Sequence, residues 1–293
     1  MLKRIIILLH FIFISFFSFG QVSFKIVSQE DSIPIPNVLL IQKSEGKGVA
    51  SDSKGIIELP ETAISSNSDF ILSAIGFEDL DINSKDIYEG KVFYLNPRVF
   101  ELDSYTISSD KLVPVYLGDT ISSIEKPISL RSSNPEKVSN LRFASYLNFK
   151  DNKDRIISNV WVYFGEFAGS ELRIRFRWFV SNEIRKPKDG KIYSSDDFFD
   201  VGESNAVYKI DKINAWSRFD LLQDEIVIPK GYKGCYFVID AIPNEYGKIT
   251  SIKIPFQNTK GNRISPAFYF GSGKGIGTYE TYGCFAMMVE YLR

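Results

Sequence analysis

Short apolar runs alternate with polar and turn-forming residues along most of this chain. In the first hundred residues the runs are separated by Gly, Pro, Asn, Asp and Ser, and no helical period lasts more than a turn or two. The runs expected to be strands cover residues 22–27, 38–42, 56–59, 69–75, 91–95 and 100–108. Strands this short, with turns between them, predict a small antiparallel β-sandwich.

Strand-like runs return after a change in composition. Residues 109–137 mix Pro, Ser and charged residues without a period, which is typical of a linker. From residue 141 to residue 292, apolar runs again alternate with polar turns, and the DNKD segment at 151–154 is expected to close a hairpin. Many short strands in this length predict a jelly-roll-like sandwich over residues 138–293. The expected fold class is therefore all-β.

The clearest strand, ELRIRFRWFV at residues 171–180, has two different faces. The apolar face consists of Leu172, Ile174, Phe176, Trp178 and Val180, and the opposite face carries Arg173, Arg175 and Arg177. Two interpretations of this arginine row are open. It could bind an acidic sugar or a phosphate through bidentate hydrogen bonds, or it could be a solvated sheet face paired with Asp or Glu of a neighbouring strand.

Trp161 and Tyr163 form a second candidate ligand surface. They lie on the face of the run 156–166 that is opposite to Val160, Val162 and Phe164. Aromatic side chains with one open face are suited to binding surfaces, and here they could stack on sugar rings. Trp178 is in phase with an apolar face and is expected in the core, so Trp161 and Tyr163 are the more open pair.

An acidic cluster lies in the polar segment after residue 190. Asp196, Asp197 and Asp200 could hold calcium, act as carboxylates of a glycosidase, or form a solvated loop. A glycosidase needs a second carboxylate across the scissile bond, and the sequence indicates none opposite this cluster. The solvated loop is therefore the favoured interpretation.

The first β-rich segment resembles a known family. The residues that carry the resemblance are Pro36, Asn37, Val38, Gly48, Val49, Ser51, Asp52, Gly55, Ser73, Ile75, Gly76, Phe77, Glu78, Leu95, Pro97 and Leu102. In this order they are similar to the carboxypeptidase-regulatory-like domain common in envelope proteins of Bacteroidetes-type bacteria. The resemblance covers residues 22–107 and implies a transthyretin-like β-sandwich that accompanies other domains and is not itself catalytic.

The second β-rich segment resembles, less specifically, the domain often found behind that module. The residues concerned are Arg175, Trp216, Phe219, Asp220, Leu221, Ile228, Pro229, Gly231, Phe237 and Val238. This resemblance covers about residues 138–293 and implies no known activity. The expected organisation is a transthyretin-like sandwich at 21–108, a linker at 109–137 and a jelly-roll-like sandwich at 138–293.

The N-terminus is typical of a secretory signal. Lys3 and Arg4 precede an apolar run from Ile5 to Phe17, and small or polar residues lead to an expected cleavage site before Gln21. A retained membrane anchor is the alternative, but a span needs about 20 apolar residues. No later run is long enough to span a membrane as a helix. We therefore expect residues 1–20 to be removed and the protein to be exported to the periplasm, the outer membrane or the extracellular space.

Histidine and cysteine usage excludes several kinds of chemistry. The chain has one histidine, His10, which lies in the expected signal. Without it, neither a Ser-His-Asp or Cys-His arrangement nor a histidine-containing zinc site can be built. The two cysteines, Cys235 and Cys284, are too few for a thiolate cluster. They could form a disulfide in an oxidising compartment, or they could be two separate buried thiols.

These observations favour a binding protein over an enzyme. The net charge of −1 does not suggest nucleic acid as a partner. We expect a non-catalytic binding or structural module of the cell envelope, without cofactor or metal, whose partner is an envelope protein or a glycan. A carbohydrate-binding protein that uses aromatics of the C-terminal β domain is the alternative, and a carboxylate-based glycan hydrolase is a third, less favoured class.

Overall fold

The structure is a computed structural model of the chain, and its described residues confirm the all-β fold class. The described residues are 20–44, 48–64, 67–98, 112–118, 120, 124–128, 142–168, 172–181, 192–193, 198–202, 206–242, 251–252, 254–257, 264–270, 275–278 and 284–293. Residues 1–19 of the predicted signal and the strand predicted at 100–108 lie outside these ranges. In the described part, no helix is long and apolar enough to cross a membrane.

The N-terminal sandwich consists of two sheets. One has the order β4 (Ile56–Pro60), β1 (Gln21–Ser28), β7 (Val92–Leu95), and the other has the order β3 (Gly48–Ala50), β2 (Leu39–Gln42), β5 (Asp69–Ser73), β6 (Leu80–Asn83). A short helix, α2 (Glu61–Ile64), and a 3-10 turn, η1 (Ser84–Asp86), join strands of this unit. Phe24, Leu40 and Phe70 lie in the core between the sheets.

One strand pair differs from the antiparallel arrangement that the sequence predicts. Strand β1 is antiparallel to β4 but parallel to β7. Between β1 and β7 the chain builds the whole second sheet, and this long connection lets it return in the same direction.

The turn between β3 and β4 explains several residues of the family resemblance. The Asp52 carboxylate accepts hydrogen bonds from the backbone amides of Lys54 and Ile56, both at 2.8 Å. Gly55 has φ +72°, and a Cβ there would collide with the carbonyl oxygen of Ile26. Glycine is therefore required at this position by both conformation and space.

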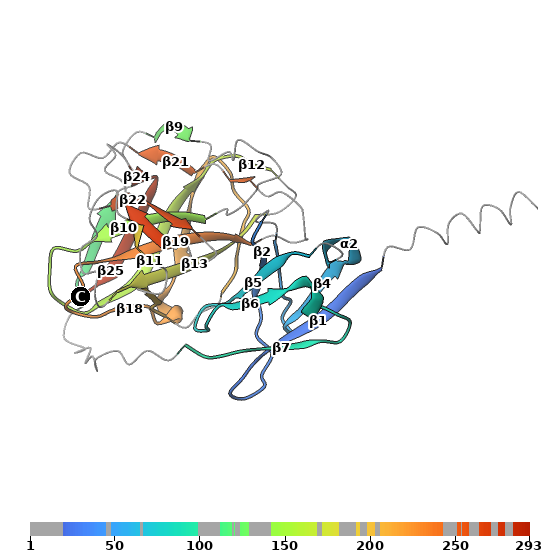
Figure 1. The fold of residues 1–293 in the computed structure, drawn as a ribbon. Helices are drawn as coiled ribbons and strands as arrows, with labels where there is room; N and C mark the ends of the chain where they lie inside the picture. Colours follow the sequence, from blue (N-terminus) through green and yellow to red (C-terminus); the bar gives the residue numbers. More distant parts are fainter. Residues whose placement is uncertain are drawn as a thin grey trace, which may run out of the picture.

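The C-terminal sandwich is larger and also consists of two main sheets (Figure 1). The larger sheet has the order β14 (Ile192–Tyr193), β23 (Gly275–Thr278), β22 (Ile264–Phe270), β10 (Arg142–Asn148), β19 (Gly234–Ile242), β13 (Leu172–Val180), β15 (Phe199–Asp200), and β16 (Tyr208–Ile210) also pairs with β13. The smaller sheet has the order β17 (Ala215–Asp220), β11 (Arg155–Phe164), β25 (Met287–Leu292), β8 (Pro114–Gly118), and β18 (Val227–Ile228) also pairs with β11.

Two small sheets and a 3-10 turn complete this unit. Strand β12 (Phe167–Ala168) pairs with β20 (Ser251–Ile252), and β21 (Ile254–Gln257) lies between β24 (Cys284–Phe285) and β9 (Ile124–Ile128). The 3-10 turn η3 (Leu222–Asp224) follows β17. The apolar face predicted for residues 171–180 is confirmed, since all five of its residues lie in the core between the two main sheets: Leu172, Ile174, Phe176, Trp178 and Val180.

The segment predicted to be a linker contributes strands to this sandwich. Residues 114–118 form β8, an edge strand paired with β25, and residues 124–128 form β9. The Leu117 side chain is 1% exposed in the core. Pro114 is the first residue of an edge strand, where the missing amide donor costs little. The sequence predicts a linker at 109–137 that partly packs on both neighbours, and the structure adds that this segment includes two strands. Proline and the shortness of the runs concealed their alternation.

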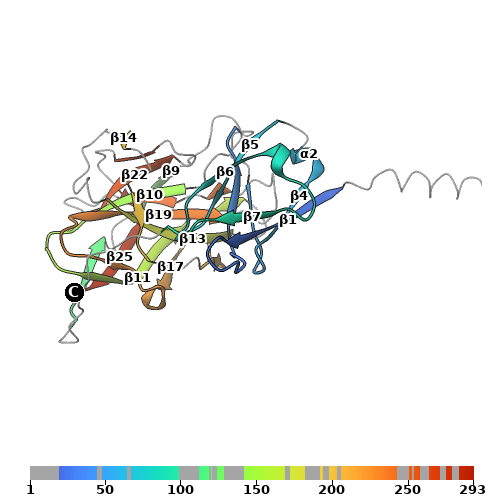
Figure 2. The ribbon, with the colours of Figure 1, turned by 60° about the horizontal axis from the view of Figure 1, so that its bottom comes forward.

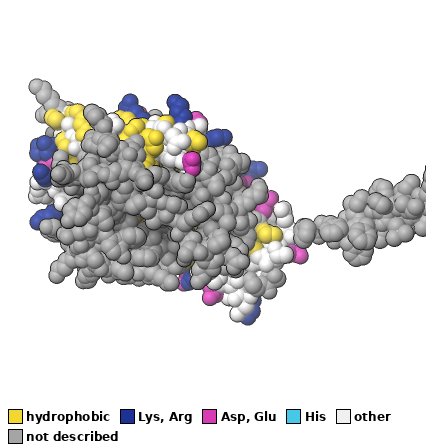
Figure 3. Space-filling view, turned by 90° about the horizontal axis from the view of Figure 1, so that it is seen from above, with side chains coloured by type: hydrophobic (Ala, Val, Ile, Leu, Met, Phe, Trp, Pro, Cys, Tyr) yellow, Lys and Arg dark blue, Asp and Glu magenta, His cyan; other side chains and the backbone are white. Residues whose placement is uncertain are grey.

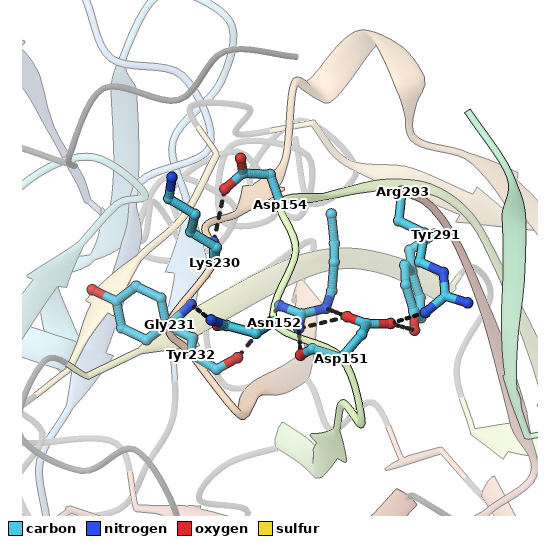
Figure 4. Close-up of polar contacts among 9 residues, drawn as sticks. Asp151, Asn152, Asp154, Lys230, Gly231, Tyr232, Tyr291 and Arg293 are labelled. Atoms are coloured by element: carbon cyan, nitrogen blue, oxygen red, sulfur yellow. Dashed lines mark hydrogen bonds and ion pairs between the residues drawn. The ribbon is translucent and has the colours of Figure 1, made fainter. Parts of the chain in front are cut away.

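The DNKD segment at 151–154 is not a hairpin turn, because it connects β10 in the larger sheet to β11 in the smaller one. It is fixed by a polar network (Figure 4). Asn152 and Asp154 accept hydrogen bonds from the backbone amides of Gly231 and Lys230. Asp151 forms ion pairs with Arg155 and with Arg293. This network holds the inter-sheet connection, the turn before β19 and the C-terminus together.

The two sandwiches lie against each other through their sheet faces (Figures 1 and 2). In β5, Phe70 and Leu72 point into the N-terminal core, whereas Ile71 and Ser73 point away from it and are still at most 5% exposed. Across the interface, Arg175 donates a hydrogen bond to the carbonyl oxygen of Asn37 and Arg177 donates one to Ser73 Oγ. The N-terminal sandwich therefore covers the outer face of the larger sheet around Arg175 and Arg177.

Candidate functional site

Four aromatic side chains gather on the outer face of the smaller sheet of the C-terminal sandwich. Val160, Val162 and Phe164 of β11 point into the core, so the residues that alternate with them point outward. The outward residues Trp161 and Tyr163 are joined by Trp216 of β17 and Tyr116 of β8, and we call this set the aromatic face: Tyr116, Trp161, Tyr163 and Trp216.

The rings of the aromatic face form two neighbouring pairs. Tyr163 and Trp216 are directly opposite in the strand register, and their ring centroids are 5.7 Å apart with an edge-to-face angle of 81°. Tyr116 and Trp161 have centroids 6.5 Å apart. Tyr116 is 48% exposed, and the other three are half-buried. Such pairs are held in a defined orientation and remain partly exposed to solvent.

A view from above shows hydrophobic side chains with Lys and Arg side chains among them along one edge of the larger unit (Figure 3). Figure 2 shows strands β11, β17 and β25 of the smaller sheet near one another. The coloured edge in Figure 3 is mixed, with apolar and charged side chains.

A β-bulge places polar groups beside the aromatic face. The register between β11 and β25 shifts between Ile157 and Asn159, so that Ser158 is the extra residue. Ser158 Oγ and Asn159 Nδ2 both donate to Glu290 Oε1, at 2.6 and 2.8 Å. Because of the bulge, two consecutive residues of one strand bind the same carboxylate.

Arg218 of β17 extends this network toward Trp161, which is directly opposite to it in the register. Arg218 Nε donates to Asn159 Oδ1 at 2.9 Å. The guanidinium carbon lies 5.3 Å from the centroid of the Trp161 ring, a cation–π distance. Arg218 itself is exposed. The site therefore offers aromatic surfaces, one carboxylate and one guanidinium side by side.

Electrostatics keep Glu290 ionised. Burial by itself would raise the pKa of Glu290, but hydrogen bonds from Ser158, Tyr116 and Asn159, with the charge of Arg218, outweigh it and lower the pKa below its ordinary value. The pKa of Tyr116 is raised, chiefly because its hydroxyl donates to this carboxylate. The carboxylate is thus charged and already supplied with donors, which suits a positioning role rather than proton transfer.

The arginine row lies elsewhere and is not a solvated face. Arg175 is fully buried and pairs with Asp240 of β19 at 3.0 Å. Arg177 is 4% exposed and forms a bidentate pair with Asp200, at 3.0 and 2.6 Å. Arg173 is half-buried on the same face. Pairing with acidic residues, one of the two interpretations of the row, is found for Arg175 and Arg177, but solvation is not, because the N-terminal sandwich covers the sheet.

The acidic cluster and the two cysteines are the other candidate residues from the sequence. Asp200 of the acidic cluster is the ion-pair partner of Arg177, while Asp196 and Asp197 lie outside the described residues. Cys235 is a free, fully buried thiol in the core, and burial raises its pKa. The structure therefore has no bridge at Cys235, and the side chain of Cys284 lies outside the described residues.

A small pocket, with a volume of about 10 Å³, opens at the junction of the sandwiches. Its walls include Ile75 from the N-terminal unit and Trp178, Tyr208 and Asp224 from the C-terminal unit. Tyr208 donates to Asp224 at 2.7 Å, and the Arg177–Asp200 pair also lines the wall. These polar side chains bind one another, so we place the candidate site at the aromatic face.

Several residues of the site were missed in the sequence. Tyr116 lay in the segment predicted to be a linker, and Glu290 lay in an apolar run at the C-terminus. Trp216 and Arg218 share one phase of the run AWSRFD, and this alternation could have placed them on one face. Their position next to Trp161 depends on strand order, which the sequence does not contain.

Fold and site together define an all-β protein of two sandwiches with an aromatic face on the second one. No family model matches the sequence, and no curated protein matches it. Its function is therefore inferred from the geometry of the site.

Proposed function

We propose that this chain is an exported, non-catalytic binding module of the cell envelope and that its aromatic face binds a glycan. The observation that carries the proposal is the gathering of Trp161, Tyr163, Trp216 and Tyr116, from three strands, around a fixed polar network. The N-terminal sandwich, in this proposal, is a carboxypeptidase-regulatory-like domain that supports the binding unit.

Glycan binding needs two kinds of contact, and the aromatic face has both. Flat apolar ring faces can stack on the C–H faces of sugars, and polar groups in fixed positions can exchange hydrogen bonds with sugar hydroxyls. Glu290 and Asn159 are held by Ser158 and Arg218 before any ligand arrives. Groups that are already fixed lose little conformational entropy on binding, which favours affinity.

The proposal is tested with a glycan array and affinity electrophoresis on the chain without its first 20 residues. We expect binding to a subset of glycans, and we expect Trp161→Ala and Tyr163→Ala each to weaken it by about tenfold, as for the loss of about 1–2 kcal/mol of stacking. Tyr94→Ala is the control, because Tyr94 is an exposed aromatic, at 48%, on the other sandwich. Absence of any glycan ligand, or an equal loss in Tyr94→Ala, would contradict the proposal.

A protein partner is the second candidate, favoured by exposed apolar side chains on the N-terminal sandwich. Val92 and Tyr94 point outward from the edge strand β7, and Tyr88 is 55% exposed nearby in sequence. Exposed apolar side chains that lie together are typical of contact surfaces. A pulldown from envelope extracts, compared between the wild-type chain and a Val92→Lys, Tyr94→Ala double variant, tests this candidate: a partner lost in the variant supports it, and an unchanged pattern contradicts it.

A further inference from the structure

Arg218 is held from two sides although it is exposed. Its Nε donates to Asn159 Oδ1 at 2.9 Å, and its guanidinium lies over the Trp161 ring at 5.3 Å. Asn159 is in turn fixed by Glu290 through a 2.8 Å hydrogen bond. A long arginine side chain normally loses rotamer freedom when it binds a ligand. Here much of that loss has occurred before binding, so the guanidinium has a defined direction on the surface.

The terminal nitrogens of this guanidinium are open. Within the described residues, no hydrogen bond is found for Arg218 other than that from Nε, and none of the ion pairs includes it. The nearby Glu290 carboxylate is occupied by donors from Ser158, Asn159 and Tyr116. Asp220, farther along the strand, accepts from the backbone amide of Leu222. The Nη groups therefore form an open pair of donors next to the aromatic rings.

We infer that the aromatic face selects glycans that carry carboxylate groups, with Arg218 as the carboxylate-binding residue. The inference rests on the proposed function and specifies its ligand class as uronic acid units in a glycan chain. A guanidinium presents two parallel N–H groups that match the two oxygens of a carboxylate, and arginine is the side chain best suited to such planar recognition. A sugar ring bound beside Trp161, whose ring face carries the guanidinium, would bring its carboxylate to these donors.

The net charge of the chain favours recognition of an anionic glycan by one local cation over attraction of the glycan to the whole surface. The chain has a net charge of −1, so a polyanion is not drawn to the molecule as a whole. In the arginine row, the other group of cations considered for acidic sugars, Arg175 and Arg177 are paired with Asp240 and Asp200 under the N-terminal sandwich. Arg218 is the exposed arginine that stands beside aromatic rings in the aromatic face.

The experiment compares uronate polymers with a carboxyl-reduced counterpart and with a polyanion that has no sugar rings. Calorimetric titration uses polygalacturonate and alginate as uronate polymers, carboxyl-reduced polygalacturonate as the neutral counterpart, and poly-L-glutamate as a polyanion without sugar rings. We expect at least one uronate polymer to bind about tenfold or more tightly than the neutral polymer, as for the gain of a charge-assisted bidentate pair. Arg218→Gln should remove this difference, and Arg218→Lys should reduce it because lysine lacks the fork.

Lys230→Gln is the matched control, because it removes one exposed positive charge at a turn that does not belong to the aromatic face. It should keep the wild-type preference. Circular dichroism of each variant confirms that it is folded. Equal binding of the uronate and neutral polymers would overturn the inference and leave glycan binding intact, whereas binding of neither polymer, or equally tight binding of poly-L-glutamate, would overturn the inference directly. A glycan array without any ligand would refute both proposals.

Discussion

Asp151 connects the start of β11 to the C-terminal end of the chain. It pairs with Arg155 and Arg293 and accepts a hydrogen bond from the Tyr291 hydroxyl at 3.2 Å (Figure 4). Arg155 is fully buried, with its guanidinium 4.3 Å from the ring centroid of Phe149. A buried guanidinium needs a fixed partner, because an uncompensated charge in the interior is costly. Asp151 supplies that partner.

The pKa of Asp151 makes this a test of stability against pH. Burial would raise the pKa, but the charge of Arg155 and hydrogen bonds from Arg293, Arg155 and Tyr291 outweigh it, so the pKa lies below the ordinary 3.8. Because the folded pKa is lowered, the carboxylate stabilises the fold above pH 3.8, and this stabilisation is lost as the pH falls from there through the folded pKa.

Asp151→Asn should therefore lower the free energy of unfolding at pH 7 by about 3 kcal/mol, because Arg155 is left buried without its counter-charge. Its stability should also fall less than that of the wild type between pH 5 and pH 2.5 or so. Urea unfolding across this range measures both effects. Asp211→Asn, at an exposed carboxylate of the same sandwich, is the control. Parallel curves for the wild type and Asp151→Asn would contradict the assignment.

At the scale of elements, the close contact between β10 and β19 fixes the centre of the larger sheet. Their register runs from Arg142 opposite Asp240 to Asn148 opposite Gly234. Gly234 lies where the ring of Tyr146 and the carbonyl oxygen of Leu147 leave no space for a Cβ. The glycine permits β19 to begin directly beside the end of β10, next to the turn held by Asn152. Glycine in a strand often marks such a close approach.

Gly234→Ala is expected to destabilise the protein by about 3 kcal/mol or more, because the added methyl group meets backbone that cannot move aside. Gly90→Ala is the matched control: nothing lies within 4 Å of the added Cβ, but φ is +74°. That strain should cost about 1–2 kcal/mol. Guanidinium unfolding of the two variants gives the comparison, and a smaller effect at Gly234 than at Gly90 would show that the close contact is relieved in solution.

At the scale of the whole molecule, the two sandwiches are joined by buried polar contacts as well as by chain connection. Arg175 pairs with Asp240 inside the C-terminal unit and donates to the Asn37 carbonyl oxygen of the N-terminal unit at 3.1 Å. Ile75 is 5% exposed and lies outside the N-terminal core cluster, on the wall of the junction pocket. These contacts can form only when the two units have one particular relative orientation.

The junction is expected to make the two sandwiches unfold together. Differential scanning calorimetry of the chain without its first 20 residues should give one transition, and Ile75→Asp should separate it into two, because an unpaired carboxylate would be buried at the junction. Ile33→Asp is the control at a side chain that is 60% exposed, and it should leave one transition. Two separate transitions already in the wild type would contradict the coupling.

The sequence by itself determined the all-β class and the inward or outward direction of side chains within a strand. Trp161 and Tyr163 point outward, and Trp178 inward, because successive side chains alternate across a sheet. The same local rule identified the two faces of β13. These properties depend on residues that are neighbours in the chain, so they can be deduced without the fold.

Only the tertiary structure decided what each strand face contacts. The arginine row looked suited to solvent or a ligand, but Arg175 and Arg177 are covered by the N-terminal sandwich, whose position depends on contacts more than a hundred residues away in sequence. Conversely, the strand order β17, β11, β25, β8 places three residues from other strands near Trp161: Tyr116, Arg218 and Glu290. Strand order and sheet packing are long-range properties, and for this reason the candidate site emerged only from the fold.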